Sequence, residues 1–196
     1  MTMHLIPRTL YWATDVNPEY LDQLEDMRST RPYLHVGYTN GMEGNSFPTG
    51  QGFDTVVCLN VVEHLSDDLG ALRSIYNALE SGGRAIILVP NDPKLFGTLD
   101  EVLGHCRRYT PEQLISVSEQ AGFRVEKLLE FNRAGAPAWW LNGKVLRRTT
   151  FGMMQIRCLN VLTPIFRRVD AWLPFPALSN IVILRKDGGA PNISAS

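Results

Sequence analysis

The hydrophobic pattern is clearest between residues 53 and 90, where a strand, a helix and a second strand follow one another. Residues 55–59 form a short apolar run rich in β-branched side chains, which predicts a strand buried on both faces. From Asp67 the spacing changes to steps of three and four, which predicts a helix with one buried stripe. The stripe consists of Leu69, Leu72, Ile75, Tyr76 and Leu79.

Glycines and a proline mark the ends of the next elements. Gly82 and Gly83 stand where a left-handed helix C-cap is expected, and residues 85–89 form a second apolar strand that ends at Pro90. A strand–helix–strand unit of this kind predicts parallel strands joined by a right-handed crossover. Ligands of such sheets bind beyond the carboxyl ends of the strands, here residues 60–64 and 91–92.

Further elements follow from similar local signals. A strand over residues 9–14 should reach Asp15, and Asn17 should cap a helix that starts at Pro18. A capping box at Thr110 predicts a helix over residues 110–121. Additional strands are expected over residues 33–38, 124–131 and 181–184. The sequence therefore predicts one α/β domain over residues 1–186 and a disordered tail over residues 187–196.

Composition narrows the class of protein. The 196 residues carry a net charge of −1, so nothing global argues for nucleic acid as a partner. Cys58, Cys106 and Cys158 are scattered without metal-like spacing, which favours a reduced, cytoplasmic protein. No signal peptide or membrane-spanning run is expected. The oligomeric state is not indicated.

Charge is distributed unevenly along the chain. Residues 131–169 contain seven Arg or Lys and no acid, and Trp139 and Trp140 lie within this stretch. Helical spacing of apolar and basic residues over 139–168 fits a lid or core helix over the substrate. It also fits peripheral contact with an anionic membrane at the inner face. The segment over residues 131–175 is therefore treated as a lid or interfacial insertion.

Several of these motifs together resemble a known family. The run Phe-Asp-Thr-Val-Val-Cys-Leu-Asn-Val-Val-Glu-His-Leu, followed by Leu-Glu-Ser-Gly-Gly-Arg, is similar to motif regions of class I S-adenosylmethionine-dependent methyltransferases. Continued through Gly-His-Cys-Arg-Arg-Tyr-Thr-Pro-Glu-Gln-Leu to Ala-Gly-Phe, it resembles a bacterial subgroup of that family. The resemblance implies a Rossmann-like, mostly parallel sheet with an antiparallel last strand. It also implies S-adenosyl-L-methionine as the cofactor.

The resemblance assigns cofactor contacts to particular positions. Asp15 matches the acid that binds the ribose diol, with Val16 beside it, since a carboxylate can accept from both hydroxyls. Asn40 lies where the family contacts adenine, and Asn60 and Val61 should lie near the cofactor through their backbone. The family's Gly-rich loop should precede Asp15, but the 14 residues before it contain no glycine. We therefore expect an N-terminally shortened domain.

Candidate acceptor-side residues surround the same sheet edge. An imidazole at His64 or His105 could take a proton from the acceptor, although His64 could instead be structural. Arg107, Arg108 and Tyr109 could line a substrate pocket, or the two arginines could pair with Asp100 and Glu101.

Some family members build a metal site from Glu-x-x-Glu-His at the position of residues 60–64. The first position here is Asn60, which leaves Glu63 and His64. A hard divalent ion would require more oxygen ligands than these two residues provide. We therefore expect no metal at this position.

Three functions are compatible with these residues and motifs. The first is methyl transfer from S-adenosylmethionine to a small-molecule or lipid-linked acceptor, which needs alignment of donor and acceptor more than a nucleophile. The second is a non-catalytic interaction domain completed by a partner or an upstream segment. A nicotinamide-dependent oxidoreductase shares the architecture but requires the same missing Gly-rich turn.

Overall fold

The structure is a computed structural model that describes residues 9–39, 52–150, 161–166 and 168–188. Its strands are β1 (Tyr11–Asp15), β2 (Leu34–Tyr38), β3 (Phe53–Leu59), β4 (Leu79–Pro90), β5 (Arg124–Phe131) and β6 (Ser179–Arg185). Its α-helices are α1 (Pro18–Arg28), α2 (Asp68–Ala78), α3 (Thr98–Leu103), α4 (Pro111–Gln120) and α5 (Gly135–Trp140). Short helical turns are η2 (Val62–His64), η3 (Pro93–Leu95), η4 (Leu141–Val145) and η5 (Asp170–Trp172).

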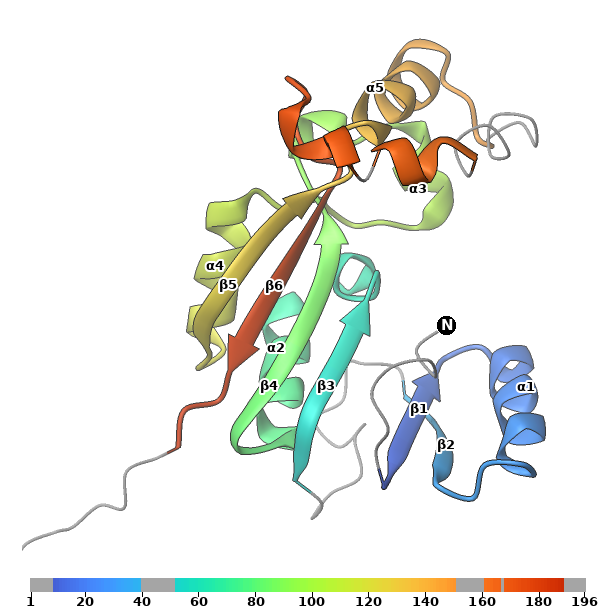
Figure 1. Cartoon of the computed structure of the whole chain (residues 1–196), viewed down its shortest axis with the longest axis vertical. Coiled ribbons are helices and arrows are strands. Elements are labelled where there is room, and N and C mark those ends of the chain that lie inside the picture. The colour runs from blue at the N-terminus through green and yellow to red at the C-terminus, as the bar shows by residue number, and fades with distance from the viewer. Residues whose placement is uncertain (1–8, 40–51, 151–160, 167, 189–196) are drawn as a thin grey trace, which may run out of the picture.

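The larger sheet has four strands in the order β3-β4-β6-β5 (Figure 1). β3 runs parallel to β4, and β6 is inserted antiparallel between β4 and β5. This arrangement confirms the predicted α/β fold, in which a mostly parallel sheet carries an antiparallel last strand. It also confirms the strands expected over residues 124–131 and 181–184.

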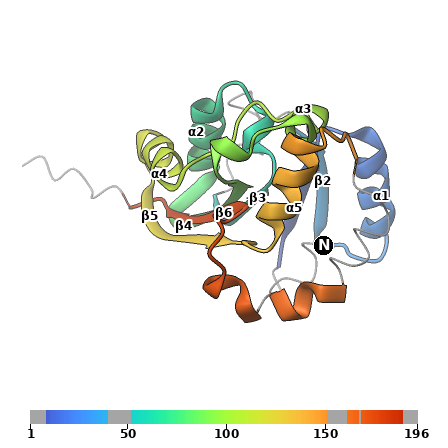
Figure 2. The ribbon, with the colours of Figure 1, turned by 90° about the horizontal axis from the view of Figure 1, so that it is seen from above.

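Helices α2 and α4 cover the same face of this sheet, as the view from above shows (Figure 2). Their apolar stripes meet alternate residues of the strands, because successive side chains of a strand point to opposite faces. Leu72 of α2, Leu114 of α4, Ile87 of β4 and Leu184 of β6 are all fully buried. The core of the molecule therefore lies between these two helices and the sheet.

Residues 55–59 do not form the doubly buried strand that the sequence predicts. No residue of β3 is fully buried, and Leu59 is 44% exposed. β3 is an edge strand that pairs only with β4 within the described residues, and both helices lie on one face. The apolar run therefore predicted the strand correctly, but the prediction that both of its faces are buried is wrong.

The predicted helix stop at Gly82 and Gly83 is also wrong. α2 ends at Ala78, and Leu79 already has extended backbone, so both glycines lie inside β4. Gly82 adopts a φ of 83°, and its N–H donates to Lys186 O at 2.8 Å. The left-handed residue bends the strand beside its partner instead of closing the helix.

A second, smaller unit contains β1, β2 and α1. The two strands pair in parallel, and Asn17 caps α1 by accepting from Glu19 N–H at 2.9 Å, as predicted. α1 has no buried residue, and Leu34 is the one fully buried residue of this unit among the described positions. Figure 1 places the unit beyond the β3 edge, and no described strand pairs with both sheets.

The ends of β3 and β4 point toward a group of short helices. α3, α5, η4 and η5 lie beyond these strand ends (Figure 1). None of the helices in the described part of the chain has the length and apolar character needed to cross a membrane. The described part of the predicted insertion over residues 131–175 lies near the edge where ligands of such sheets bind.

Candidate functional site

The carboxyl ends of the two parallel strands carry residues with unusual backbone. Asn60 follows β3 with a φ of 53°, and Asp92 follows β4 with a φ of 57°. Asn and Asp tolerate this left-handed region better than other side chains, but it still stores local strain. Asn60 is held there because its N–H donates to Leu88 O at 3.0 Å. Both left-handed residues thus lie at strand ends, where the fold is expected to bind its ligand.

The four side chains that follow Asn60 differ in burial. Val61 is 42% exposed, whereas Val62 and Glu63 are buried and His64 is half-buried. Glu63 therefore points inward, and His64 lies at the boundary with solvent. A hydrogen bond from Cys106 N–H to Glu63 O, at 2.8 Å, ties this turn to the loop after α3.

Asp100 in α3 is the centre of a buried polar network. Its carboxylate accepts from Gly97 N–H at 3.0 Å, Arg108 Nε at 2.7 Å and Trp139 Nε1 at 3.2 Å. His105 Nδ1 lies 2.8 Å from its Oδ1. Burial by itself would raise the pKa of Asp100, but the bond to His105 and the charge of Arg108 hold it below its ordinary value. The carboxylate therefore stays ionised and fixes its neighbours.

Glu63 lies close to this network without being part of it. Its side chain is fully buried, and neither carboxylate oxygen has a hydrogen-bond partner in the described part of the chain. Burial raises the pKa of Glu63 to about 7. The rings of His64 and His105 meet edge to face with their centroids 4.8 Å apart. The structure thus brings together the two histidines that the sequence singled out and adds Glu63 to them.

The three predicted substrate residues, Arg107, Arg108 and Tyr109, differ in their exposure to solvent. Arg108 and Tyr109 are 4% and 3% exposed, and both line the same pocket as Arg107. Arg108 pairs with Asp100, as the alternative interpretation held, and its guanidinium lies 4.8 Å from the Trp139 ring centre. Tyr109 donates to Asp68 Oδ2 at 2.8 Å. Both residues therefore hold the loop between α3 and α4 in place through buried side-chain contacts.

Arg107 is the member of the group that reaches the surface. It pairs with Asp68 at 2.8 Å rather than with Glu101, and it donates to Ser66 O at 2.8 Å. It lines a pocket of about 500 Å³ together with Asp68, Arg108, Tyr109 and one side of α4 as far as Gln120. The lining includes Glu112 and Gln113 but none of Asp15, Asn60 and His64. The pocket lining therefore does not include the predicted cofactor residues Asp15 and Asn60.

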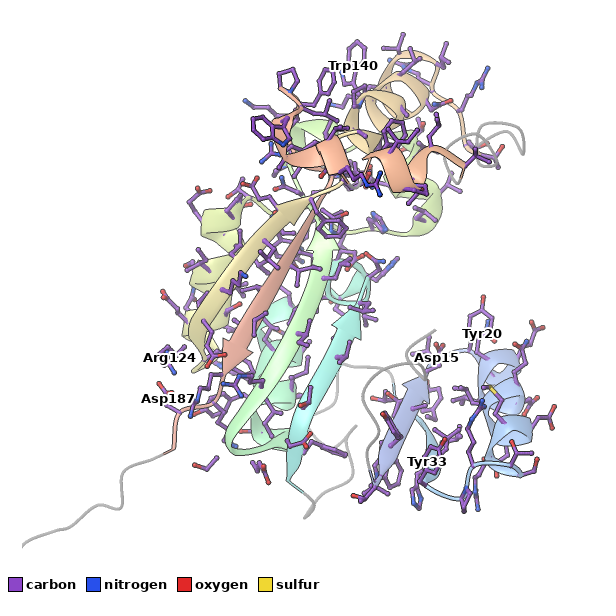
Figure 3. All side chains as sticks on the ribbon, in the orientation of Figure 1. Asp15, Tyr20, Tyr33, Arg124, Trp140 and Asp187 are labelled. Carbon is purple, nitrogen blue, oxygen red and sulfur yellow. The ribbon has the colours of Figure 1, made fainter. Side chains whose placement is uncertain are left out.

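The predicted cofactor residues of the first unit lie at the end of β1. Asp15 Oδ1 accepts from Asn17 N–H at 2.8 Å, which holds the carboxylate at the strand tip (Figure 3). Val16 is 56% exposed next to it. Asn40 lies outside the described residues. Asp15 thus occupies the strand-end position that the sequence predicted.

Two members of the site were not identified as such from the sequence. Asp100 was considered only as an ion-pair partner, and Trp139 only as part of a lid or interface. Trp139 lies 39 positions from Asp100, so no local pattern reports their hydrogen bond. An acid in the first turn of a short helix was the available signal in the sequence, but first-turn acids are also common at exposed helix starts.

Comparison with known proteins identifies a family. A family model described as a methyltransferase domain matches residues 12–128. This range includes β1, β3, β4 and the loop that carries His105. No curated protein matches the chain.

Solved structures share the fold at low sequence identity. A protein from Galdieria sulphuraria assigned as a sarcosine dimethylglycine methyltransferase is 13% identical, with a TM-score of 0.61, over 91% of this chain and 70% of that one. The N-methyltransferase NodS from Bradyrhizobium japonicum WM9, solved with S-adenosyl-L-homocysteine, is 14% identical, with a TM-score of 0.56, over 90% and 66% of the two chains. The [4+2]-cyclase SpnF is 15% identical, with a TM-score of 0.58, over 92% and 68%. The same fold therefore also occurs in a protein named for another reaction.

Proposed function

Because the methyltransferase-domain model matches more than half of it, the chain belongs to that family, and we propose that it transfers a methyl group from S-adenosylmethionine to an acceptor nucleophile. The observation that carries the proposal is that three features lie at the edge formed by the carboxyl ends of strands, one in the β1–β2 sheet and two beside β3 of the larger sheet. These are the strand-end acid Asp15, the left-handed turn at Asn60 and the cluster of Glu63, His64 and His105. In such folds this edge binds the ligand.

Cofactor binding is assigned to the strand ends. The carboxylate of Asp15, with Val16 beside it, would accept from the ribose hydroxyls, and the backbone of Asn60 and Val61 would lie along the cofactor. Asn40 is assigned to the adenine side. The sulfonium of the cofactor already activates the methyl group, so the protein mainly aligns donor and acceptor and excludes water.

Acceptor activation is assigned to the histidine cluster. His105 is held by the buried Asp100, and His64 is held by Gly104, so both imidazoles have fixed orientations. Arg108 and Tyr109 hold the loop between α3 and α4 in place through buried contacts. Arg107 remains the candidate for contact with an anionic part of the acceptor.

The surface above the strand ends supports one class of acceptor over the other. Trp140, which Figure 3 shows in this region, is 50% exposed. Other large apolar side chains of the segment are also exposed, including Ile165 at 58% and Trp172 at 86%. Lys144, Arg147, Arg148 and Arg168 are exposed in the same segment, and Asp170 is the one acid in residues 131–175. Exposed aromatic rings beside cations suit a membrane surface with anionic headgroups. We therefore favour a lipid-linked acceptor, with a free small molecule as the alternative.

Vesicle binding tests this acceptor class. The full chain should sediment with vesicles of phosphatidylglycerol and phosphatidylcholine and remain unbound with phosphatidylcholine alone. Trp140→Ala with Trp172→Ala, and separately Arg147→Gln with Arg148→Gln, should reduce sedimentation, since each cation near the surface contributes about 1 kcal/mol. Tyr20→Ser and Lys127→Gln are matched exposed controls outside the segment. Equal sedimentation with both vesicle types, or unaffected variants, would leave the free small molecule as the acceptor.

Cofactor titration tests the enzyme assignment itself. Isothermal titration with S-adenosyl-L-homocysteine should give one site, and incubation with methyl-labelled cofactor and membrane lipid extract should label a lipid-soluble product. Binding without labelled product in lipid or metabolite extracts would contradict the transferase assignment and leave a cofactor-binding domain.

A second candidate function is a non-catalytic interaction domain. The observation in its favour is that β1 pairs only with β2, and β3 only with β4, within the described strands. Edges of this kind can be extended by a strand from another polypeptide segment. Absence of any cofactor binding, together with intact folding, would favour this function.

A further inference from the structure

Glu63, His64 and His105 form a compact group of potential metal ligands. One ligand atom from each residue can be chosen so that all three lie within 4.8 Å of one another. Glu63 and His64 come from the turn after β3, and His105 comes from the loop after α3. The fold therefore creates a three-residue constellation that the spacing of the sequence does not reveal.

The two imidazoles each use Nδ1 for an anchoring contact. His64 Nδ1 lies 3.1 Å from Gly104 O, and a carbonyl can only accept, so this nitrogen carries the proton. His105 Nδ1 lies 2.8 Å from Oδ1 of Asp100, an oxygen that also accepts from Arg108 Nε at 2.7 Å. In both neutral rings Nε2 then presents its lone pair. An imidazole whose other nitrogen donates to a carbonyl or a carboxylate is the usual arrangement of a metal-binding histidine.

The third group is a buried carboxylate without a partner. Glu63 is 0% exposed, and neither of its oxygens accepts a hydrogen bond from any described residue. Buried polar atoms in folded proteins are nearly always satisfied, and an isolated buried carboxylate is costly. A cation between Glu63 and the two imidazoles would satisfy it.

We propose that Glu63, His64 and His105 bind a divalent first-row metal ion, with Zn²⁺ as the best match. Two imidazole nitrogens and one carboxylate oxygen suit this ion, whereas Mg²⁺ and Ca²⁺ prefer more oxygen ligands. Ligand atoms around tetrahedral zinc lie about 3.3 Å apart, so the three side chains would have to move closer together to complete the site. The expectation of no metal considered only Glu63 and His64, because His105 is distant in sequence.

Three protein ligands leave a coordination position open. Water or an oxygen of the acceptor can occupy it, and a metal-bound hydroxyl loses its proton more readily than a free one. His64 is half-buried, so the ion reaches the group from the solvent side. This catalytic role rests on the proposed methyl transfer, but metal binding itself does not.

Competition with a chromogenic chelator measures the binding directly. The full chain, stripped with a chelator and then titrated with Zn²⁺, should bind one ion, and Co²⁺ should give a visible absorption spectrum of a low-coordinate site. Glu63→Gln and His105→Asn should each weaken binding by about 10-fold to 100-fold or more, since even partners of metal ligands contribute this much. His35→Asn is the matched control, because His35 stacks on Trp12 in the other unit, with ring centres 5.0 Å apart. It should leave the affinity unchanged.

Two outcomes would overturn the proposal. One is no Zn²⁺ binding by the folded chain, and the other is unchanged affinity in both Glu63→Gln and His105→Asn. Thermal unfolding of each variant establishes folding, and His64→Asn replaces a variant that does not fold. S-adenosyl-L-homocysteine titration of the stripped chain separates the two proposals. Cofactor binding without metal binding contradicts only the metal site, whereas metal binding without cofactor binding supports the metal site and contradicts the transferase.

Discussion

The four-stranded sheet and the β1–β2–α1 unit differ sharply in how much they bury. Between the four-stranded sheet and its two helices, Leu72, Leu114, Ile87 and Leu184 are completely buried, whereas α1 buries no residue. The histidine cluster belongs to the densely packed region. Asp15, the proposed ribose ligand, belongs to the other. The proposed cofactor site therefore joins the well-packed region around the four-stranded sheet to the β1–β2–α1 unit, which has little core of its own.

This difference has a thermodynamic consequence. Elements with few buried apolar contacts open at lower free energy than the core of a domain. A ligand that binds only when both regions are in place stabilises the weaker one by mass action. Cofactor binding should therefore change the β1–β2–α1 unit more than the four-stranded sheet.

Core truncation should show the largest difference between the regions. Leu72→Ala should lower the free energy of unfolding by about 2–5 kcal/mol, because it removes buried methyl groups and leaves a cavity. Leu24→Ala in α1, where the side chain is only half-buried, should cost less than about 1 kcal/mol. Urea denaturation followed by circular dichroism measures both values. Similar losses in the two variants would contradict the contrast.

Asp15→Asn should have a smaller effect, confined to ligand binding. Asn keeps an oxygen for Asn17 N–H but removes the charge, so the affinity for S-adenosyl-L-homocysteine should fall about 10-fold to 100-fold. Isothermal titration measures the change. Asp22→Asn, another acid of this unit, is the control. An unchanged affinity in Asp15→Asn would remove this residue from the site.

Loss of the α1 cap should have the smallest effect. Asn17→Ala removes the acceptor for Glu19 N–H and should cost about 1 kcal/mol of local helix stability. Hydrogen exchange should become faster in α1 and stay unchanged in β4 and β6. Faster exchange throughout the chain would show that the two regions unfold together.

Most of the fold could be predicted because its signals are local. The capping box at Thr110, the cap at Asn17 and the strand over residues 181–184 each depend on neighbouring residues, and each prediction is confirmed. The exposure of β3 was not predictable, since an apolar run does not report whether a second strand or helix covers it. Gly82 was misread because a left-handed glycine serves a helix cap and a strand bend equally well.

The candidate site was predictable by residue type but not by arrangement. His64 and His105 were singled out, yet their proximity depends on how two loops fold against each other. The burial of Arg108 and Tyr109 depends on Asp100 and Asp68, which lie 8 and 41 positions away. Side-chain orientation in such loops is set by tertiary contacts, which no local pattern encodes.

Hydrogen exchange with and without S-adenosyl-L-homocysteine tests the central claim most directly. Binding across the two regions should slow exchange in residues 11–38 and in residues 60–64, with the larger change in the first range because it has the smaller core. Protection limited to residues 60–64, or no protection in either range, would contradict a cofactor site that joins the two regions.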